Sequence, residues 1–241
     1  MATNILELKN ISKTFKSDLL KRNQKVLIDI SCSFETGVAT AVLGHNGAGK
    51  TTSLRIILGL LKQDSGQVLF RGKPIINEDR RNIGYMPETN KLPAELKSPE
   101  LLYFHLNLFK PELKTKEKKE LVDHTLNEVG LFKHHRNKKI SQLSKGLGRR
   151  LAWAMASIHD PQLLILDEPF TGMDPLGRKE LSEWITARSQ KGSSVLLTSH
   201  DLKTSKELCS QFVIFKLGSL VYHGPSSLPE EDVLNFYRGV L

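Results

Sequence analysis

A short glycine-rich segment constrains this chain more than any other part of its sequence. Residues 44–51 read Gly-His-Asn-Gly-Ala-Gly-Lys-Thr, which fits the pattern G-x-x-x-x-G-K-[ST]. The apolar run Thr40–Leu43 precedes this segment, and the helical pattern TTSLRIILGLL follows it. A strand, a glycine loop and a helix in this order predict a phosphate-binding loop, because glycines let backbone N–H groups converge on phosphate oxygens.

Two side chains of this loop have distinct expected tasks. Lys50 is expected to reach the β- and γ-phosphates, and the hydroxyl of Thr51 is expected to bind Mg²⁺. A glycine-rich turn without a ligand is the competing interpretation, and the flanking strand and helix disfavour it. The predicted nucleotide-binding residues of the loop are Gly44, His45, Asn46, Gly47, Ala48, Gly49, Lys50, Thr51 and Thr52.

Two adjacent carboxylates end a second apolar run. Leu163–Leu166 reads as a strand buried on both faces, and Asp167 and Glu168 follow it directly. Acidic residues at the carboxyl end of such a strand lie where α/β proteins bind ligands, so Asp167 is expected in the Mg²⁺ shell and Glu168 as a general base. A surface turn is the alternative, and the glycine loop makes it the weaker one.

These two motifs together predict a phosphate-loop NTPase without specifying its class. A GTPase requires a guanine-reading Asn-Lys-x-Asp motif, and the nearest string, at residues 137–140, lacks the Asp. A kinase requires a small lid and an acceptor site, and neither is recognisable in the sequence.

Composition excludes several other classes. The chain has 241 residues, 39% hydrophobic residues and two cysteines, which excludes a disulfide mini-protein and makes a reducing cytoplasm the expected compartment. No apolar run is long enough to span a membrane, and the start MATNILELKN does not resemble a secretory signal. The net charge of +9 favours an anionic partner such as a nucleotide, nucleic acid or membrane surface.

The order of apolar runs predicts an α/β fold with a mostly parallel sheet. Its strands are expected at Thr40–Leu43, Leu163–Leu166 and Val195–Thr198. Ile5–Phe15 and Val26–Phe34 read as an N-terminal antiparallel pair joined by the polar stretch KSDLLKRNQK, and Val213–Phe215 and Leu220–Tyr222 read as a hairpin that turns at Gly218. Helices opening at Ser98, over KEKKELVDHTLNEVGLF to about Gly130, and over Ser144–His159 form a helical insert at about 90–160.

A third motif narrows the function. Residues 140–150 read Ile-Ser-Gln-Leu-Ser-Lys-Gly-Leu-Gly-Arg-Arg, and Ser144 and Gly146 open another helix. At this point the sequence resembles the ATP-binding cassette family, whose signature reads Leu-Ser-Gly-Gly-Gln. The resemblance covers essentially the whole chain, so residues 1–241 are expected to form one ATP-binding domain with the helical insert as a subdomain.

Further motifs occur in the family's order. Asp174, in Thr171-Gly-Met-Asp-Pro175, resembles the aspartate of the loop after the carboxylates, and a turn-forming Asp before Pro is its alternative. His200 resembles the family's switch histidine, with a satisfied polar residue at a strand end as the alternative. Phe15 matches the aromatic position that stacks on adenine, with a plain core residue as the alternative.

Two positions depart from the family pattern. Lys145 and Leu147 replace Gly and Gln of the signature, whereas Ser144 and Gly146, which face the γ-phosphate in the family, are kept. Glu88 stands where the family's loop glutamine aligns, and it is expected near Mg²⁺. The string LSKG with Pro87-Glu88 resembles the branch that energises exporters of drugs, polysaccharides, lipids or sodium.

The resemblance implies an ATPase that works as a dimer around two ATP molecules with Mg²⁺. Hydrolysis would then drive a separate membrane permease, with the helical insert as its docking surface and the basic segment 110–139 near the anionic cytoplasmic leaflet. A soluble ATPase of the same fold that acts on nucleic acid or ribosomes is the alternative, although such proteins usually carry two cassettes or long coiled-coil inserts. A nucleotide sensor without activity is disfavoured, because Lys50, Asp167, Glu168 and His200 are all present.

Overall fold

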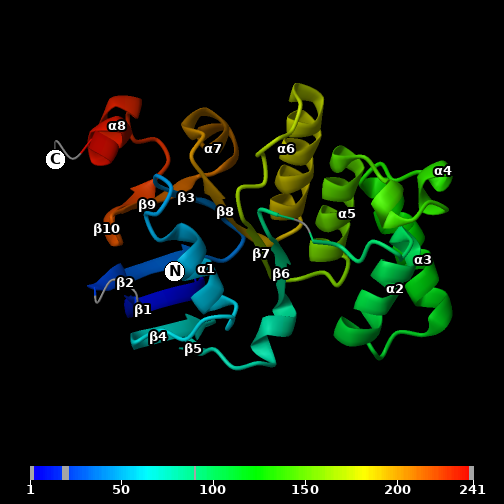
Figure 1. Cartoon of the computed structure of the whole chain (residues 1–241), viewed down its shortest axis with the longest axis horizontal. Helices are drawn as coiled ribbons and strands as arrows, with labels where there is room; N and C mark the ends of the chain where they lie inside the picture. The colour runs from blue at the N-terminus through cyan, green and yellow to red at the C-terminus, as the bar shows by residue number, and fades with distance from the viewer. Residues whose placement is uncertain (1–2, 18–21, 90, 239–241) are drawn as a thin grey trace.

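Two β-sheets and the helices around them make up the structure (Figure 1). This computed structural model describes residues 3–17, 22–89 and 91–238. The antiparallel sheet has the order β2-β1-β4-β5, with β1 at Asn4–Ser17, β2 at Arg22–Glu35, β4 at Ser65–Phe70 and β5 at Lys73–Pro74. The second sheet has the order β10-β9-β3-β8-β7-β6.

This second sheet is parallel except at one edge. Its strands are β3 (Ala39–Leu43), β6 (Ile83–Met86), β7 (Leu163–Leu166), β8 (Ser194–Ser199), β9 (Gln211–Lys216) and β10 (Ser219–Pro225). Neighbours from β9 to β6 pair in parallel, and β10 is antiparallel to β9. The predicted α/β class is therefore confirmed.

The central strands are buried on both faces. In β7, Leu164 and Leu166 join one buried cluster, whereas Leu163 and Ile165 join another. Because successive side chains of a strand point to opposite faces, a strand between two cores must be apolar throughout. The continuous apolar runs of the sequence have this physical origin.

The helices connect and cover the sheets. They are α1 (Lys50–Ile57), α2 (Ser98–Phe109), α3 (Thr115–Glu128), α4 (Lys133–Arg136), α5 (Lys145–Ser157), α6 (Pro175–Gln190), α7 (Leu202–Leu208) and α8 (Glu230–Arg238), with short 3₁₀ turns at Asp79–Asn82 and Ile140–Gln142. Helices α2 to α5 lie together at one side of the molecule, at the right in Figure 1. The expected helices of the insert are confirmed, and its status as a subdomain of one domain over 1–241 stays a prediction.

The predicted β-hairpins are present, with one correction. β1 pairs with β2 from Asn4 with Glu35 as far as Ser17 with Arg22. The stretch 16–25, expected as a connection, is therefore strand at both ends, because backbone pairing continues beyond the apolar residues. Residues 18–21 of that stretch lie outside the described residues.

The sequence did not predict β4 and β6. β6 lies at the edge of the parallel sheet, and α5 packs against it at Gly84, where a Cβ would overlap the carbonyl oxygen of Ala156. This close approach attaches the helical insert to the sheet.

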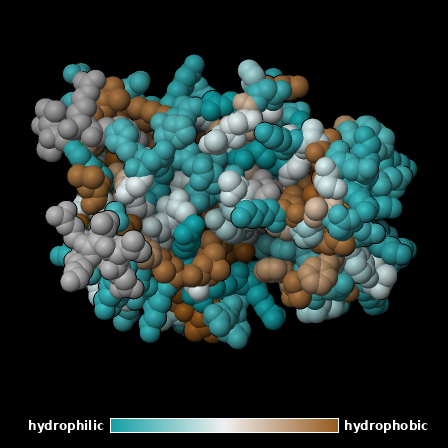
Figure 2. All heavy atoms as spheres, in the orientation of Figure 1, coloured by the Kyte–Doolittle hydropathy of each residue, from teal (hydrophilic) through white to brown (hydrophobic). Residues whose placement is uncertain are grey.

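The face drawn in Figure 2 is mostly hydrophilic, and one of the places where hydrophobic atoms gather on it is the α2 side of the insert. Phe104 and Leu108 of α2 are both more than half exposed. Among the described residues, no helix combines the length and the apolar character needed to cross a membrane.

Candidate nucleotide-binding site

The glycine loop between β3 and α1 is held tightly against its neighbours. Gly49, the residue before α1, has φ 107°. A Cβ at this position would lie 2.6 Å from Leu27 Cδ2 and 2.9 Å from the carbonyl oxygen of Val26. A Cβ at Gly44 would lie 2.5 Å from the carbonyl oxygen of Phe215. Both glycines are therefore required by backbone contact as well as by conformation.

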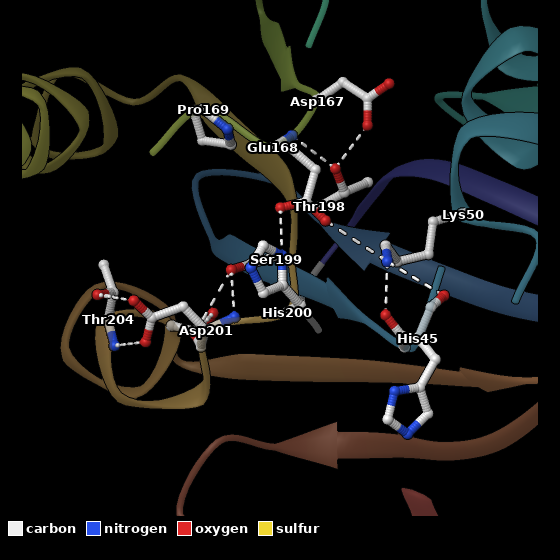
Figure 3. A network of polar contacts seen from close by, with 12 residues as sticks. His45, Lys50, Asp167, Glu168, Pro169, Thr198, Ser199, His200, Asp201 and Thr204 are labelled. Carbon is white, nitrogen blue, oxygen red and sulfur yellow. Dashed lines mark hydrogen bonds and ion pairs between the residues drawn. The ribbon is translucent and has the colours of Figure 1, made fainter. Parts of the chain in front are cut away.

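Lys50 begins α1 and is only 6% exposed. Its Nζ donates to the carbonyl oxygens of Gly44 at 2.5 Å and His45 at 3.4 Å, and it forms an ion pair with Glu168 Oε1 at 3.5 Å (Figure 3). The two motifs predicted from separate parts of the sequence therefore meet at this ammonium group.

A hydrogen-bonded chain connects the two carboxylates after β7 with the end of β8. The backbone N–H of Glu168 donates to Thr198 Oγ1 at 2.8 Å, and that hydroxyl donates to Asp167 Oδ1 at 2.6 Å (Figure 3). Burial raises the pKa of the Asp167 carboxyl above its ordinary value, while hydrogen bonds from Thr198 and Thr51 and the charge of Lys50 act in the opposite direction. The charge of the adjacent Glu168 adds to the effect of burial, so the net shift is upward and the surroundings favour the protonated form of Asp167.

His200 follows β8 and contacts the carboxylate of Glu168, on the oxygen that Lys50 does not contact. Its Nδ1 lies 2.9 Å from Glu168 Oε2 (Figure 3). The ring is largely exposed. Glu168 thus lies between a buried ammonium group and an imidazole at the edge of the site.

Lys50 and Glu168 border a cavity of about 160 Å³ at the glycine loop, whereas Asp167, Thr198 and His200 are not among its lining residues. Glu88 and Glu168 line it beside the loop residues His45, Asn46, Gly47, Gly49, Lys50, Thr51 and Thr52, together with Val26. The chain can therefore place phosphates against backbone N–H groups and an ammonium group, beside the carboxylates that line the same cavity.

Other predicted residues lie apart from this cavity. Phe15 is 41% exposed on β1, with Lys13 Nζ 5.8 Å from its ring centroid. Ser144 and Gly146 are exposed at the start of α5, and among the described residues neither lines the cavity. Asp174 Oδ1 accepts a hydrogen bond from the Gly177 N–H at 2.8 Å, so it caps α6. The functional roles predicted for all these site residues stay predictions.

Two residues of the site received no role from the sequence. Thr198 ends a predicted strand, and a polar residue at that place was the available signal. Arg149 donates to the backbone carbonyl oxygens of Glu88, Glu168 and Pro169. No sequence pattern indicates such contacts, because backbone acceptors occur at every residue.

Comparison with known proteins decides the family. The family model described as "ABC transporter" matches residues 27–171, more than half of the chain. The chain belongs to the ABC transporter family. The expected resemblance is thereby confirmed.

Relatives of known name agree with this assignment. The lipopolysaccharide export system ATP-binding protein LptB of Haemophilus influenzae is 30% identical over 98% of this chain and 98% of its own length. An uncharacterized ABC transporter ATP-binding protein of Methanocaldococcus jannaschii is 33% identical over 91% of this chain and 77% of its own length. A solved ATP-binding subunit of an ABC transporter superposes with a TM-score of 0.82 at 30% identity, covering 98% of this chain and 94% of that one. The chain is thus an ABC ATP-binding subunit and an ATPase.

Proposed function

We propose that this ABC ATP-binding subunit pairs with a second cassette around two ATP molecules, and that hydrolysis drives a separate membrane permease. One observation carries the proposal: the glycine loop and the start of α5 are both suited to anions, yet the described cavity contains only the first. The exposed Ser144 and Gly146 are then available to the ATP of the other cassette. A dimeric ATP-binding cassette with bound ADP and Pi shares the fold, with a TM-score of 0.83 at 22% identity.

In each site, residues of one chain hold the nucleotide. Gly44 to Thr52 surround the phosphates, and Lys50 releases Glu168 to contact the β- and γ-phosphates. Phe15, exposed on β1, offers its ring to the adenine. Asp174, which caps α6 at the end of the loop after the carboxylates, is assigned to the same nucleotide-binding site.

Magnesium fits the acidic end of β7. The carboxylate of Asp167 and the hydroxyl of Thr51, which helps to hold the pKa of that carboxyl down, supply the oxygen donors that Mg²⁺ prefers. A divalent cation would also stabilise a charge that burial disfavours. We assign Thr51, Asp167 and Glu88 to the ion, which when bound neutralises charge on the phosphates.

Glu168 is the proposed general base. Its carboxylate borders the cavity and is oriented by His200 at 2.9 Å. A carboxylate in this position accepts a proton from the attacking water, and His200 keeps it aimed at the γ-phosphate.

The permease is proposed to dock on the helical insert. A groove of about 450 Å³ lies between α2 and α3 and is lined by Tyr103, Phe104 and Val122 among others. The exposed aromatic surface of Phe104 suits an apolar segment of a partner, and the basic segment 110–139 suits the anionic cytoplasmic leaflet. The subunit is then peripheral on that membrane face, without a role in binding nucleic acid.

Transport outward is the proposed direction. The supporting observations are the names of two relatives, LptB and the Nod factor export ATP-binding protein I of Sinorhizobium fredii, which is 34% identical over 97% of this chain and 68% of its own length.

Glu168→Gln tests the proposal. The amide keeps the shape of the side chain and removes its basicity, so ATPase turnover should fall about 10²–10⁴-fold while ATP still binds and holds the dimer closed. Turnover, retained nucleotide and dimer mass are measured with Mg²⁺. Glu112→Gln, an exposed change of the same type, serves as the matched control. Equal turnover in the wild type and Glu168→Gln would remove Glu168 from the role of base.

A further inference from the structure

The peptide of Glu168 has an unusual conformation. Its φ is 45°, in the left-handed region that residues with a Cβ rarely occupy. Such a conformation persists only where the surroundings hold it, and it is found preferentially at functional sites. The contacts that hold this peptide therefore decide where the carboxylate lies.

The peptide groups flanking the Glu168 Cα are held on both sides. Its N–H donates to Thr198 Oγ1 at 2.8 Å, which joins it to β8. Its carbonyl oxygen accepts from Arg149 Nη2 at 3.1 Å and from the Thr171 N–H at 3.2 Å. The same Arg149 nitrogen donates to the carbonyl oxygen of Pro169 at 2.6 Å.

Arg149 also reaches the other predicted acidic residue of the cavity. Its Nη1 donates to the carbonyl oxygen of Glu88 at 3.2 Å. Only a planar guanidinium fork provides two nitrogens that point in fixed, different directions, so a lysine cannot reproduce all three contacts. Arg149 is half-buried, which strengthens hydrogen bonds from its charge to these carbonyl groups.

The position of Arg149 in the chain gives these contacts a further meaning. It belongs to α5, the helix that begins at the exposed Ser144 and Gly146. Helix α5 is the helix proposed to meet the ATP of the other cassette. The Arg149 side chain thus connects this helix to the peptide groups of Glu168 and Glu88.

We propose that Arg149 is a positioning residue, which holds the Glu168 peptide in its left-handed conformation and so makes hydrolysis depend on the placement of α5. This inference rests on the proposed role of Glu168 as base. Arg149 does not touch the nucleotide loop in any described contact, so ATP binding should be nearly independent of it.

The test combines substitutions at both positions in the full chain. Arg149→Ala should lower kcat about tenfold, the effect of losing hydrogen bonds from a charged group worth about 1.5 kcal/mol, and leave KM for ATP within about threefold. Arg149→Lys should recover part of the loss. In the Glu168→Gln background, where no base remains to be positioned, Arg149→Ala should change the single-turnover rate less than about twofold.

Arg150→Ala is the matched control. This neighbouring arginine of α5 donates to the Val129 carbonyl oxygen and pairs with Glu180, so it anchors the same helix without contacting the Glu168 peptide. Its effect on the rate should be the same in both backgrounds. Thermal unfolding shows which variants remain folded, and Arg149→Lys carries the test if Arg149→Ala does not fold.

The outcomes separate the inference from the proposed function. An equal fold-loss for Arg149→Ala with and without Glu168→Gln, or a loss confined to KM, would overturn the positioning role. An active Glu168→Gln variant would instead overturn the proposed base.

Discussion

The N-termini of α1 and α5 are chemically alike but differently surrounded. No side chain of the described residues caps α1, whose preceding Gly49 is buried and pressed against β2. α5 is capped by Ser144, whose Oγ accepts from the Leu147 N–H at 3.3 Å, and a Cβ at Gly146 would meet only that oxygen, at 4.0 Å. One helix start is enclosed by its own chain, and the other is open.

This difference separates binding from assembly. Phosphate oxygens can satisfy the N–H groups at α1 within a single chain, because the loop, Lys50 and the carboxylates already surround them. At α5 the space above Gly146 is unfilled by the described chain, so a ligand there must be brought by another molecule. The comparison predicts that damage at α1 acts in its own chain, and that damage at α5 acts on the partner.

The largest expected effect is on nucleotide trapping, when one substitution at α1 and one at α5 are placed in different chains of a dimer. Lys50→Ala removes the phosphate clamp, and Gly146→Asp places a carboxylate against the γ-phosphate, where like charges repel. Each homodimer should trap no nucleotide. A mixed dimer collects both lesions in one site and leaves the other intact, so it should trap about one ATP for every two chains.

Labelled ATP measures this trapping in mixed dimers purified through two different tags. Glu168→Gln is present in both chains, so turnover does not obscure occupancy. Mixed dimers that trap no nucleotide would contradict a site shared between chains, because the model of separate lesions leaves one complete site.

Alanine at the two glycines gives the next largest contrast. Gly49→Ala forces a Cβ against Leu27 and the Val26 carbonyl at φ 107°, a conformation that alone costs about 1–3 kcal/mol, so both stability and ATP affinity should fall. Gly146→Ala adds a good helix former in open space and should raise the free energy of unfolding by up to about 1 kcal/mol.

ATPase activity should nevertheless fall in Gly146→Ala, because the added methyl group lies on the face proposed to approach the partner's nucleotide. Urea unfolding and ATP titration of each variant check the contrast. A destabilised Gly146→Ala variant would show that the start of α5 is enclosed by its own chain after all.

The smallest expected effect concerns the buried acid beside α1. Asp167 has its pKa raised by burial, so its folded form binds the proton more tightly than the unfolded form. Its contribution to stability is therefore present below the unfolded pKa of about 3.9 and is lost as pH rises through the folded value. Asp167→Asn should unfold at a higher temperature than wild type at pH 7 without Mg²⁺, by about 2–4 °C for each kcal/mol gained.

The rise in unfolding temperature of Asp167→Asn should become smaller toward pH 4. Saturating Mg²⁺ and ATP should reverse its sign, because Asn binds the ion poorly. Glu88→Gln is the comparison, because Glu88 is exposed. It should leave the unfolding temperature unchanged and raise the Mg²⁺ concentration needed for ATPase activity more than it changes ATP affinity. Superimposable Mg²⁺ titrations of Glu88→Gln and wild type would remove Glu88 from the ion's surroundings.

The sequence alone predicted the elements whose chemistry is local. Leu163–Leu166 is a strand in the structure at the predicted bounds. All four side chains are apolar, and a strand with a core on each of its two faces buries every one of them. The glycine loop was predictable for the same reason, since its pattern, its preceding strand and its following helix are adjacent in the chain. Each motif follows a predicted strand, and the structure brings Lys50 and Glu168 together as an ion pair.

Only the tertiary structure decided the contacts made through backbone atoms. β6 is a short edge strand whose Gly84 matters because α5 approaches it closely, and its four residues carry too weak a pattern to be recognised. The sequence shows a polar Thr198 at a strand end, but it does not show the contacts of Thr198 and Arg149 with the Glu168 peptide or the φ of 45° at Glu168. Every residue has an N–H or a carbonyl group to offer, so which of them an arginine or threonine binds is determined by the packing of α5, β7 and β8.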